Sequence, residues 1–222
     1  MVLYCRPVAQ TRGWEGLPGA LTVLVGALVT NLFTVVGIVW LGMSPGNAFV
    51  LFVVENILVG VSTFVTLRRT RAESTAMNAK FFALHFGTFT GVHAIFTTII
   101  AAMLGVDATF FALVLPVLIL LFRFFSEIWA VIRATAAGPV MRPPSVVPIA
   151  YGRVVPLHLG VIAGMMAGIS SLSPADSNDL AGISAFGLDF PRLVVLGLLV
   201  VKTIADVIVA IVIARTRSTA GA

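Results

Sequence analysis

Eight ionisable side chains stand in stretches of the sequence that are otherwise apolar. They are Glu55, His85, His93, Arg123, Glu127, His158, Lys202 and Asp206. A charged side chain is costly inside a bilayer, so it usually faces the interior of a helix bundle and often serves the function of the protein there. These residues are therefore the first candidates for a functional site.

Four of these side chains are predicted to share one depth in the membrane, namely His85, Glu127, His158 and Asp206. A rise of about 1.5 Å per residue along a helix places all four in the half of the membrane nearer the cytoplasm. Imidazoles and carboxylates are ligands for zinc, iron, manganese and copper, and the facing helices of a bundle can direct such groups toward one ion. The sequence therefore predicts a buried transition-metal site, with its role (redox, hydrolytic or structural) left open.

A second layer of candidate ligands lies closer to the middle of the membrane and contains His93 and Glu55, with Lys202 beside them. His85 and His93 are eight residues apart, which is about 12 Å along a helix axis. One ion between both histidines is therefore disfavoured. Residues expected to orient the carboxylates without binding the ion are Arg153, Lys202, Arg123 and Asn56.

A purely structural network is one alternative to the metal site. Arg123 and Glu127 are four residues apart, as are Lys202 and Asp206, and side chains at this spacing meet on a helix surface. Such pairs would hold helices in register without binding anything. This arrangement would suit an accessory subunit of a larger membrane complex.

Two further alternatives stay open. A proton-coupled transporter or channel would need a wet path past Glu55, His93 and Asp206. Haem is an alternative cofactor, because two histidines from different helices can serve as its axial ligands. Motifs for phosphate binding (P-loop), zinc proteolysis (HExxH) and serine hydrolysis (G-x-S-x-G) are not found in the sequence, so no reaction class is predicted.

The elements that must position these residues are membrane-spanning helices. The chain is 59% hydrophobic and 10% charged, with a mean hydropathy of +1.08, whereas soluble domains are about 45–50% apolar and about 25% charged. Six apolar runs have about the length of 20 residues, or more, that a span requires: 18–41, 48–67, 81–104, 109–132, 154–171 and 190–214. We therefore predict an all-α integral membrane protein, a single domain of residues 1–222 with six spans in a lipid bilayer.

The charged residues between these runs predict the orientation. Cations precede the first run and follow the second, fourth and sixth: Arg6, Arg12, Arg68, Arg69, Arg71, Lys80, Arg133, Arg142, Arg153, Arg215 and Arg217. The opposite connections hold one cation, Arg192, and four aspartates, Asp107, Asp176, Asp179 and Asp189. The positive-inside rule then places both termini in the cytoplasm and the chain in the cell membrane.

Partners other than lipid are only loosely constrained. The cations are spread over short connections and form no basic, aromatic surface, so nucleic-acid binding is not expected. Connections this short are compatible with a homo-oligomer or a larger membrane complex, and no partner protein is predicted by the sequence.

Four segments together resemble a family of prokaryotic membrane proteins, domain of unknown function 6498. They are "VVENILVGV" (53–61), "FFALHFGTFTGVHAIF" (81–96), "YGRVVPLHLGVIAG" (151–164) and "LLVVKTIADV" (198–207). The resemblance marks Glu55, Asn56, His85, Gly87, Phe89, His93, Gly152, Arg153, His158, Lys202 and Asp206, and a family glutamate matches Glu127. Two positions depart from the family pattern, with Phe86 in place of a tyrosine and Ala150 in place of a proline. The resemblance implies no known activity.

Overall fold

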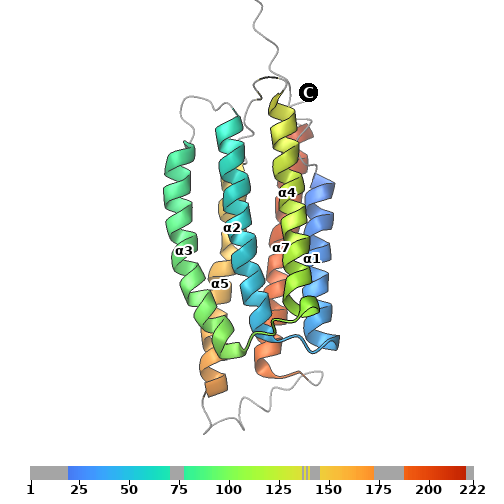
Figure 1. The fold of residues 1–222 in the computed structure, drawn as a ribbon, viewed down its shortest axis with the longest axis vertical. Helices are drawn as coiled ribbons and strands as arrows, with labels where there is room; N and C mark the ends of the chain where they lie inside the picture. The colour runs from blue at the N-terminus through green and yellow to red at the C-terminus, as the bar shows by residue number, and fades with distance from the viewer. Residues whose placement is uncertain are drawn as a thin grey trace, which may run out of the picture.

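A computed structural model describes residues 20–70, 78–136, 138, 140, 146–172 and 188–218. Within this part of the chain the regular structure consists of helices: α1 (Ala20–Trp40), α2 (Pro45–Arg69), α3 (Ala79–Leu104), α4 (Leu115–Ala136), α5 (Val146–Leu172) and α7 (Phe190–Ser218). A π-helical turn, η2 (Phe110–Val114), leads directly into α4. The predicted all-α class is confirmed for the described residues (Figure 1).

Five helical stretches of the described chain are long and apolar enough to cross a membrane: Pro45–Arg69, Ala79–Leu104, Phe110–Ala136, Val146–Ala167 and Phe190–Arg215. The apolar part of α1, Leu24–Trp40, is shorter. The outer surface is apolar as well, with side chains such as Leu84 and Phe122 exposed. This pattern suits a multi-pass protein whose helices are surrounded by lipid.

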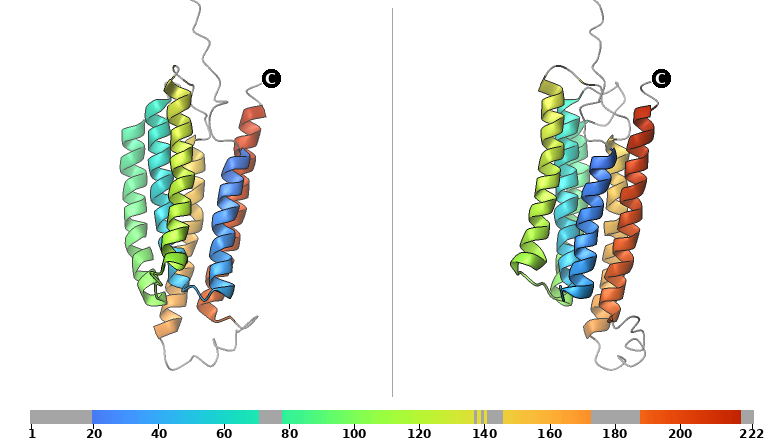
Figure 2. Two further views of the ribbon diagram at one scale, coloured as in Figure 1. Left: turned by 45° about the vertical axis from the view of Figure 1, so that its right-hand side comes forward. Right: turned by 90° about the vertical axis from the view of Figure 1, so that its right-hand side faces the viewer.

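The six α-helices of the described residues form a closed ring. In order around it, α3 contacts α2, α2 contacts α4, α4 contacts α1, α1 contacts α7, α7 contacts α5, and α5 returns to α3. α2 also contacts α5 and α7 across the ring. Successive helices run in opposite directions, so the start of α1 and the end of α7 lie at the same end of the bundle (Figures 1 and 2).

The start of α5 differs from the prediction. The connection between the predicted runs 109–132 and 154–171 contains four prolines, which disfavour regular helix, yet α5 begins at Val146, eight residues before the second of these runs. Pro148 is the third residue of α5, where the backbone N–H would have no partner inside the helix in any case. A proline therefore costs little at this position, and the expectation was wrong for 146–152. Pro139, Pro143 and Pro144 lie outside the described residues.

The start of α2 is fastened to the connection between α3 and α4. The Ser44 hydroxyl donates to the Gly105 carbonyl at 2.7 Å. The Asn47 side chain donates to the Asp107 and Ala112 carbonyls at 2.8 and 2.9 Å, and its Oδ1 accepts from the Asp107 N–H at 2.8 Å. These bonds satisfy backbone groups that the lipid could not satisfy, and they fix one end of α2 relative to α3 and α4.

Candidate functional site

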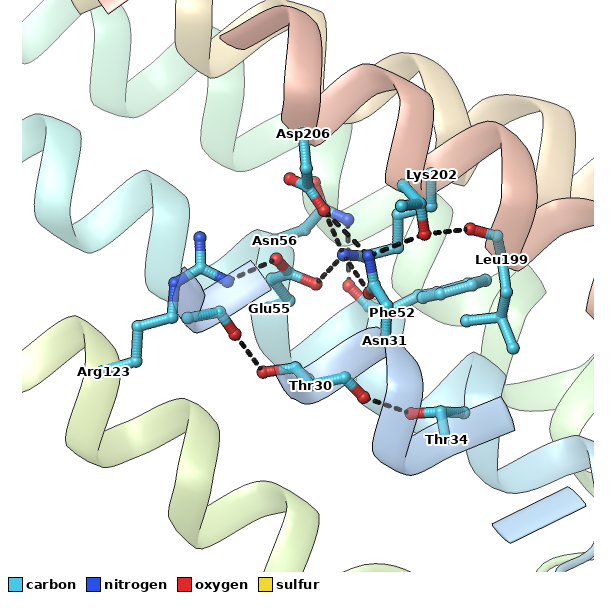
Figure 3. Close-up of polar contacts among 12 residues, drawn as sticks. Thr30, Asn31, Thr34, Phe52, Glu55, Asn56, Arg123, Leu199, Lys202 and Asp206 are labelled. Carbon is cyan, nitrogen blue, oxygen red and sulfur yellow. Dashed lines mark hydrogen bonds and ion pairs between the residues drawn. The ribbon is translucent and has the colours of Figure 1, made fainter. Parts of the chain in front are cut away.

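Charged and amide side chains of α1, α2, α4, α5 and α7 form a cluster inside the bundle, which we call the ionic centre. It draws residues from five helices: Asn31 (α1), Glu55 and Asn56 (α2), Arg123 and Glu127 (α4), Arg153 (α5), and Lys202 and Asp206 (α7). All of them except Arg153, which is half-buried, are buried. Figure 3 shows Asn31, Glu55, Lys202 and Asp206 converging on one point.

Lys202 lies at that point of convergence. Its ammonium donates to Asp206 Oδ2 at 2.9 Å and to Asn31 Oδ1 at 2.8 Å, and it forms an ion pair with Glu55 Oε2 at 2.9 Å. Asn31 also donates through Nδ2 to Asp206 Oδ2 at 3.2 Å and to Thr203 Oγ1 at 3.1 Å. Lys202 therefore joins α1, α2 and α7 through strong, charge-assisted bonds.

Arg123 is held more loosely on the opposite side of Glu55. Its Nη1 lies 3.5 Å from Glu55 Oε1, and its Nε lies 3.5 Å from Glu127 Oε1. The side chain passes over the backbone of α1 at Gly26, where an added Cβ would come within 2.9 Å of Arg123 Cδ. Glu55 thus offers one oxygen to Arg123 and the other to Lys202 (Figure 3).

The charges of the ionic centre cancel. The carboxylates of Glu55, Glu127 and Asp206 balance the cations of Arg123, Arg153 and Lys202. A balanced group of ions is less costly to bury than an unpaired charge. The uptake of a single proton would nevertheless leave the centre with one uncompensated positive charge inside the membrane.

A small cavity of about 20 Å³ adjoins the ionic centre. Its polar lining residues are Glu55, Asn56, Arg153, Lys202 and Asp206. Asn56 donates to the Phe52 carbonyl within its own helix, but its Oδ1 and the Nε of Arg153 are buried and have no hydrogen-bond partner among the described residues. The volume suffices for one water molecule, which could donate to Asn56 Oδ1 and accept from Arg153 Nε.

The three histidines lie elsewhere, along α3 and α5. His93 Nε2 is 2.8 Å from His158 Nδ1, and His93 Nδ1 is 2.9 Å from the Phe89 carbonyl. His85 is exposed on α3, where its ring stacks on Phe81 with the centroids 5.8 Å apart. Imidazoles are therefore absent from the ionic centre as the structure describes it.

The prediction of a metal-binding function is wrong. Within the described ranges no group of three or more histidine, cysteine, aspartate or glutamate side chains is placed to hold one ion. In the predicted inner layer, His158 pairs with His93 instead, while Asp206 faces Lys202. Glu127 faces Arg123, and His85 lies on the outer surface.

The residues of the predicted second layer do not all meet either. Glu55 and Lys202 do meet, whereas His93 belongs to the histidine pair across the α2–α5 contact. Of the residues predicted to orient carboxylates, Arg123 and Lys202 contact them directly, and Arg153 and Asn56 line the adjoining cavity. Sequence reasoning did not place Asn31 in the site. The sequence does contain a signal for it, because Asn31 is an amide in the predicted run 18–41, which has no ionisable residue.

Comparisons with known proteins give one match. The model of a family described as "Family of unknown function (DUF6498)" matches residues 17–222. No curated protein and no solved structure matches the chain. The family match confirms the resemblance that the four sequence segments indicated.

Proposed function

The chain belongs to the family of unknown function DUF6498, and from that premise and the geometry of the ionic centre we propose that it is a membrane transport protein that carries protons. One observation supports this function above the others: Glu55 and Asp206, from two different helices, share the ammonium of Lys202 at 2.9 Å each. Ionisable groups inside a membrane-spanning bundle commonly mark a proton or ion pathway.

The shared ammonium suggests how a proton would be held and released. A proton that binds Glu55 Oε2 neutralises that carboxylate and so removes its ion pair with Lys202, while the ammonium keeps its hydrogen bonds to Asp206 and Asn31. The contact through Lys202 between α2 and α7 is thereby loosened, although the Lys202–Asp206 pair within α7 persists. When the proton leaves, Glu55 is ionised again and the contact between the helices re-forms. The protonation state of Glu55 would thus bias how α2 sits against α7.

The cavity beside the centre supports a route for the proton toward one end of the bundle. Arg153, which lines it, is seven residues after Val146, the first residue of α5, or about two helical turns from that end. A water molecule between Asn56 Oδ1 and Arg153 Nε would link Glu55 to this side. We assign the proton's exit or entry to this end of α5.

A structural network is the second candidate, and a different observation favours it. The ionic centre joins residues of five helices and is electrically balanced, which suffices to hold a helix bundle in register. The two functions differ in one measurable respect, because a purely structural centre carries no proton across the membrane.

Proton flux into proteoliposomes distinguishes these functions. The full-length chain is reconstituted with a pH-sensitive dye inside the vesicles, and a potassium diffusion potential, negative inside, drives protons inward. We expect the lumen to acidify faster than in protein-free vesicles. Glu55→Gln should lose most of this flux because an amide cannot take up the proton. Asp189→Asn, which alters an exposed acid outside the bundle interior, should retain it.

Two results would contradict proton transport: a wild-type flux equal to that of empty vesicles, or a Glu55→Gln variant with full flux. Size-exclusion profiles and thermal unfolding of each variant show whether a lost flux reflects lost structure. A wild-type protein without flux whose Glu55→Gln variant is strongly destabilised would favour the structural network.

We further propose that α1 is a sixth span, that both termini are cytoplasmic, and that the chain resides in the cell membrane. α1 occupies a place in the ring between α4 and α7, and its start lies at the same end as the end of α7 (Figure 1). The exposed cations at this end include Arg68, Lys80 and Arg133. The cations Arg6, Arg12, Arg71 and Arg142 and the acids Asp176 and Asp179 lie outside the described residues.

The single cysteine of the chain tests this orientation. Cys5 precedes α1, so a cytoplasmic N-terminus predicts that a membrane-impermeant maleimide added to intact cells leaves it unlabelled. The same reagent should label Cys5 once the membrane is made permeable. Labelling in intact cells would place the N-terminus outside and contradict the proposed orientation.

A further inference from the structure

A groove of about 340 Å³ runs along the outer face of the bundle between α3 and α5. Its lining includes His85, Phe89, Tyr151, Val155, His158 and Leu159. The volume falls in the range of about 300–1,000 Å³ that is usual for small-molecule sites. His85, His158 and Leu159 are exposed on this face, so the groove opens toward the lipid.

The hydrogen bonds of the histidine pair determine which polar atom faces the groove. The Phe89 carbonyl can only accept, so His93 Nδ1, 2.9 Å away, carries the proton of the neutral imidazole. His93 Nε2 is then an acceptor and receives the proton of His158 Nδ1 at 2.8 Å. The remaining nitrogen of neutral His158, Nε2, has no proton and is an unused acceptor on a side chain that lines the groove.

Tyr151 adds a second polar group that lacks a partner. Its hydroxyl is buried and makes no hydrogen bond with any described residue, while its ring lies 5.9 Å from that of His85. A buried polar group without a hydrogen bond is costly, and the hydrocarbon of a bilayer offers no water to satisfy it. Lipid chains therefore leave both His158 Nε2 and the Tyr151 hydroxyl without a hydrogen-bond partner.

Aromatic rings form the wall beside these polar groups. The Phe89 ring stacks on His93 with the centroids 4.0 Å apart, and it lies 6.3 Å from the His158 ring at an interplanar angle of 30°. Stacked and tilted rings are favourable neighbours for a further aromatic ring. The wall therefore suits a flat ring better than a flexible hydrocarbon chain.

We propose that this groove binds a membrane-dissolved aromatic alcohol of the phenol class. The phenol hydroxyl donates to His158 Nε2, and its ring packs beside Phe89. The site lies across the α2–α5 contact from the ionic centre, so it does not depend on proton transport by that centre.

Nitrogen NMR of the histidines tests the hydrogen bonds directly. The chain has three histidines, so ¹⁵N-histidine labelling of the full-length protein in lipid nanodiscs gives few resonances, each assignable by substitution. Without ligand we expect the Nδ1–H tautomer for both His93 and His158. Addition of 4-hexylphenol should shift the His158 Nε2 resonance to a saturable limit, whereas hexylbenzene, which lacks the hydroxyl, should leave it unchanged.

Equilibrium binding of radiolabelled 4-hexylphenol to the same nanodiscs measures the affinity. His158→Ala should weaken saturable binding about tenfold, the equivalent of one hydrogen bond. Ile204→Ala, which alters an exposed side chain on α7 away from the groove, should leave the affinity unchanged. The wild-type comparison of hexylphenol with hexylbenzene keeps the test decisive if His158→Ala fails to fold.

Three results would overturn the proposal. Equal affinity for hexylbenzene would leave an apolar groove without a hydrogen bond to the ligand. Equal affinity for 1-decanol would point to a lipid hydroxyl instead of a phenol. Absence of saturable binding, together with a dimer in native mass spectrometry, would mean that a second copy of the chain covers the groove. None of these results bears on proton flux, so this site and the proposed function can fail separately.

Discussion

Replacing Lys202 by methionine is expected to lower the free energy of unfolding by about 3–5 kcal/mol, the usual cost of removing one partner from a buried ion pair. Methionine has a similar length but donates no hydrogen bond. Among the described residues, Glu55 would keep only Arg123 at 3.5 Å, and Asp206 would keep only the Asn31 amide at 3.2 Å. Denaturant unfolding of the purified protein in micelles, followed by circular dichroism, measures the loss.

A second substitution should restore part of that stability. Asp206→Asn in the Lys202→Met background removes a buried carboxylate that has lost its cation. The double variant is therefore expected to be more stable than Lys202→Met alone. The matched control is Lys80→Met, because Lys80 is the only other lysine and is exposed at the start of α3. A loss below about 1 kcal/mol for Lys202→Met, as for exposed ion pairs, would show that water reaches the ammonium.

Gly46→Ala is expected to cost at least about 3 kcal/mol, the upper end of the usual penalty for overpacking. An added Cβ at Gly46 would overlap the carbonyl oxygen of Gly105 and lie 2.5 Å from that of Ala101. Both are backbone atoms, so no side chain can rotate to make room. The Ser44 hydroxyl also holds the Gly105 carbonyl in place at 2.7 Å. Thermal unfolding in micelles should show a large drop in midpoint.

The same substitution at Gly197 controls for the effect of alanine itself. An added Cβ there meets no atom within 4 Å, and alanine favours helix over glycine by about 1 kcal/mol. Gly197→Ala is therefore expected to be neutral or slightly stabilising. Comparable stability of Gly46→Ala and Gly197→Ala would mean that α2 can move away from the end of α3.

The proposed proton route and the proposed ligand groove lie on opposite sides of the α2–α5 contact. The ionic centre is enclosed by α1, α2, α4, α5 and α7, whereas the histidine pair joins α3 to α5. Arg153 and His158, five residues apart on α5, face these two different environments. α5 is thus the element that both proposed sites share.

Most of the helices could be predicted from the sequence because lipid imposes a simple condition on them. A span needs about 20 apolar residues whose backbone groups bond within the helix, and each predicted run coincides with a helix to within a few residues at most of its ends. The start of α5 was not predicted correctly, because a proline such as Pro148 is compatible both with the first turn of a helix and with a loop.

Less of the site could be predicted, for a geometric reason. Residue spacing gives the depth of a side chain along its own helix. This depth is similar for His85, Glu127, His158 and Asp206, which is why the sequence predicts that they meet. The rotation of each helix about its axis decides which groups meet. α3 turns His85 outward to the groove and His93 toward His158, so neither histidine reaches the carboxylates.

The sequence by itself determined that this is an all-α membrane protein of the DUF6498 family with ionisable residues inside its helices. Composition, run length and motif order are local properties, and they suffice for those conclusions. Only the tertiary structure decided that Lys202 binds Glu55, Asp206 and Asn31, and that the histidines form a separate pair. These pairings join residues as far apart in the chain as Asn31 and Lys202, and the order of helices around a ring depends on side-chain packing that no single segment specifies.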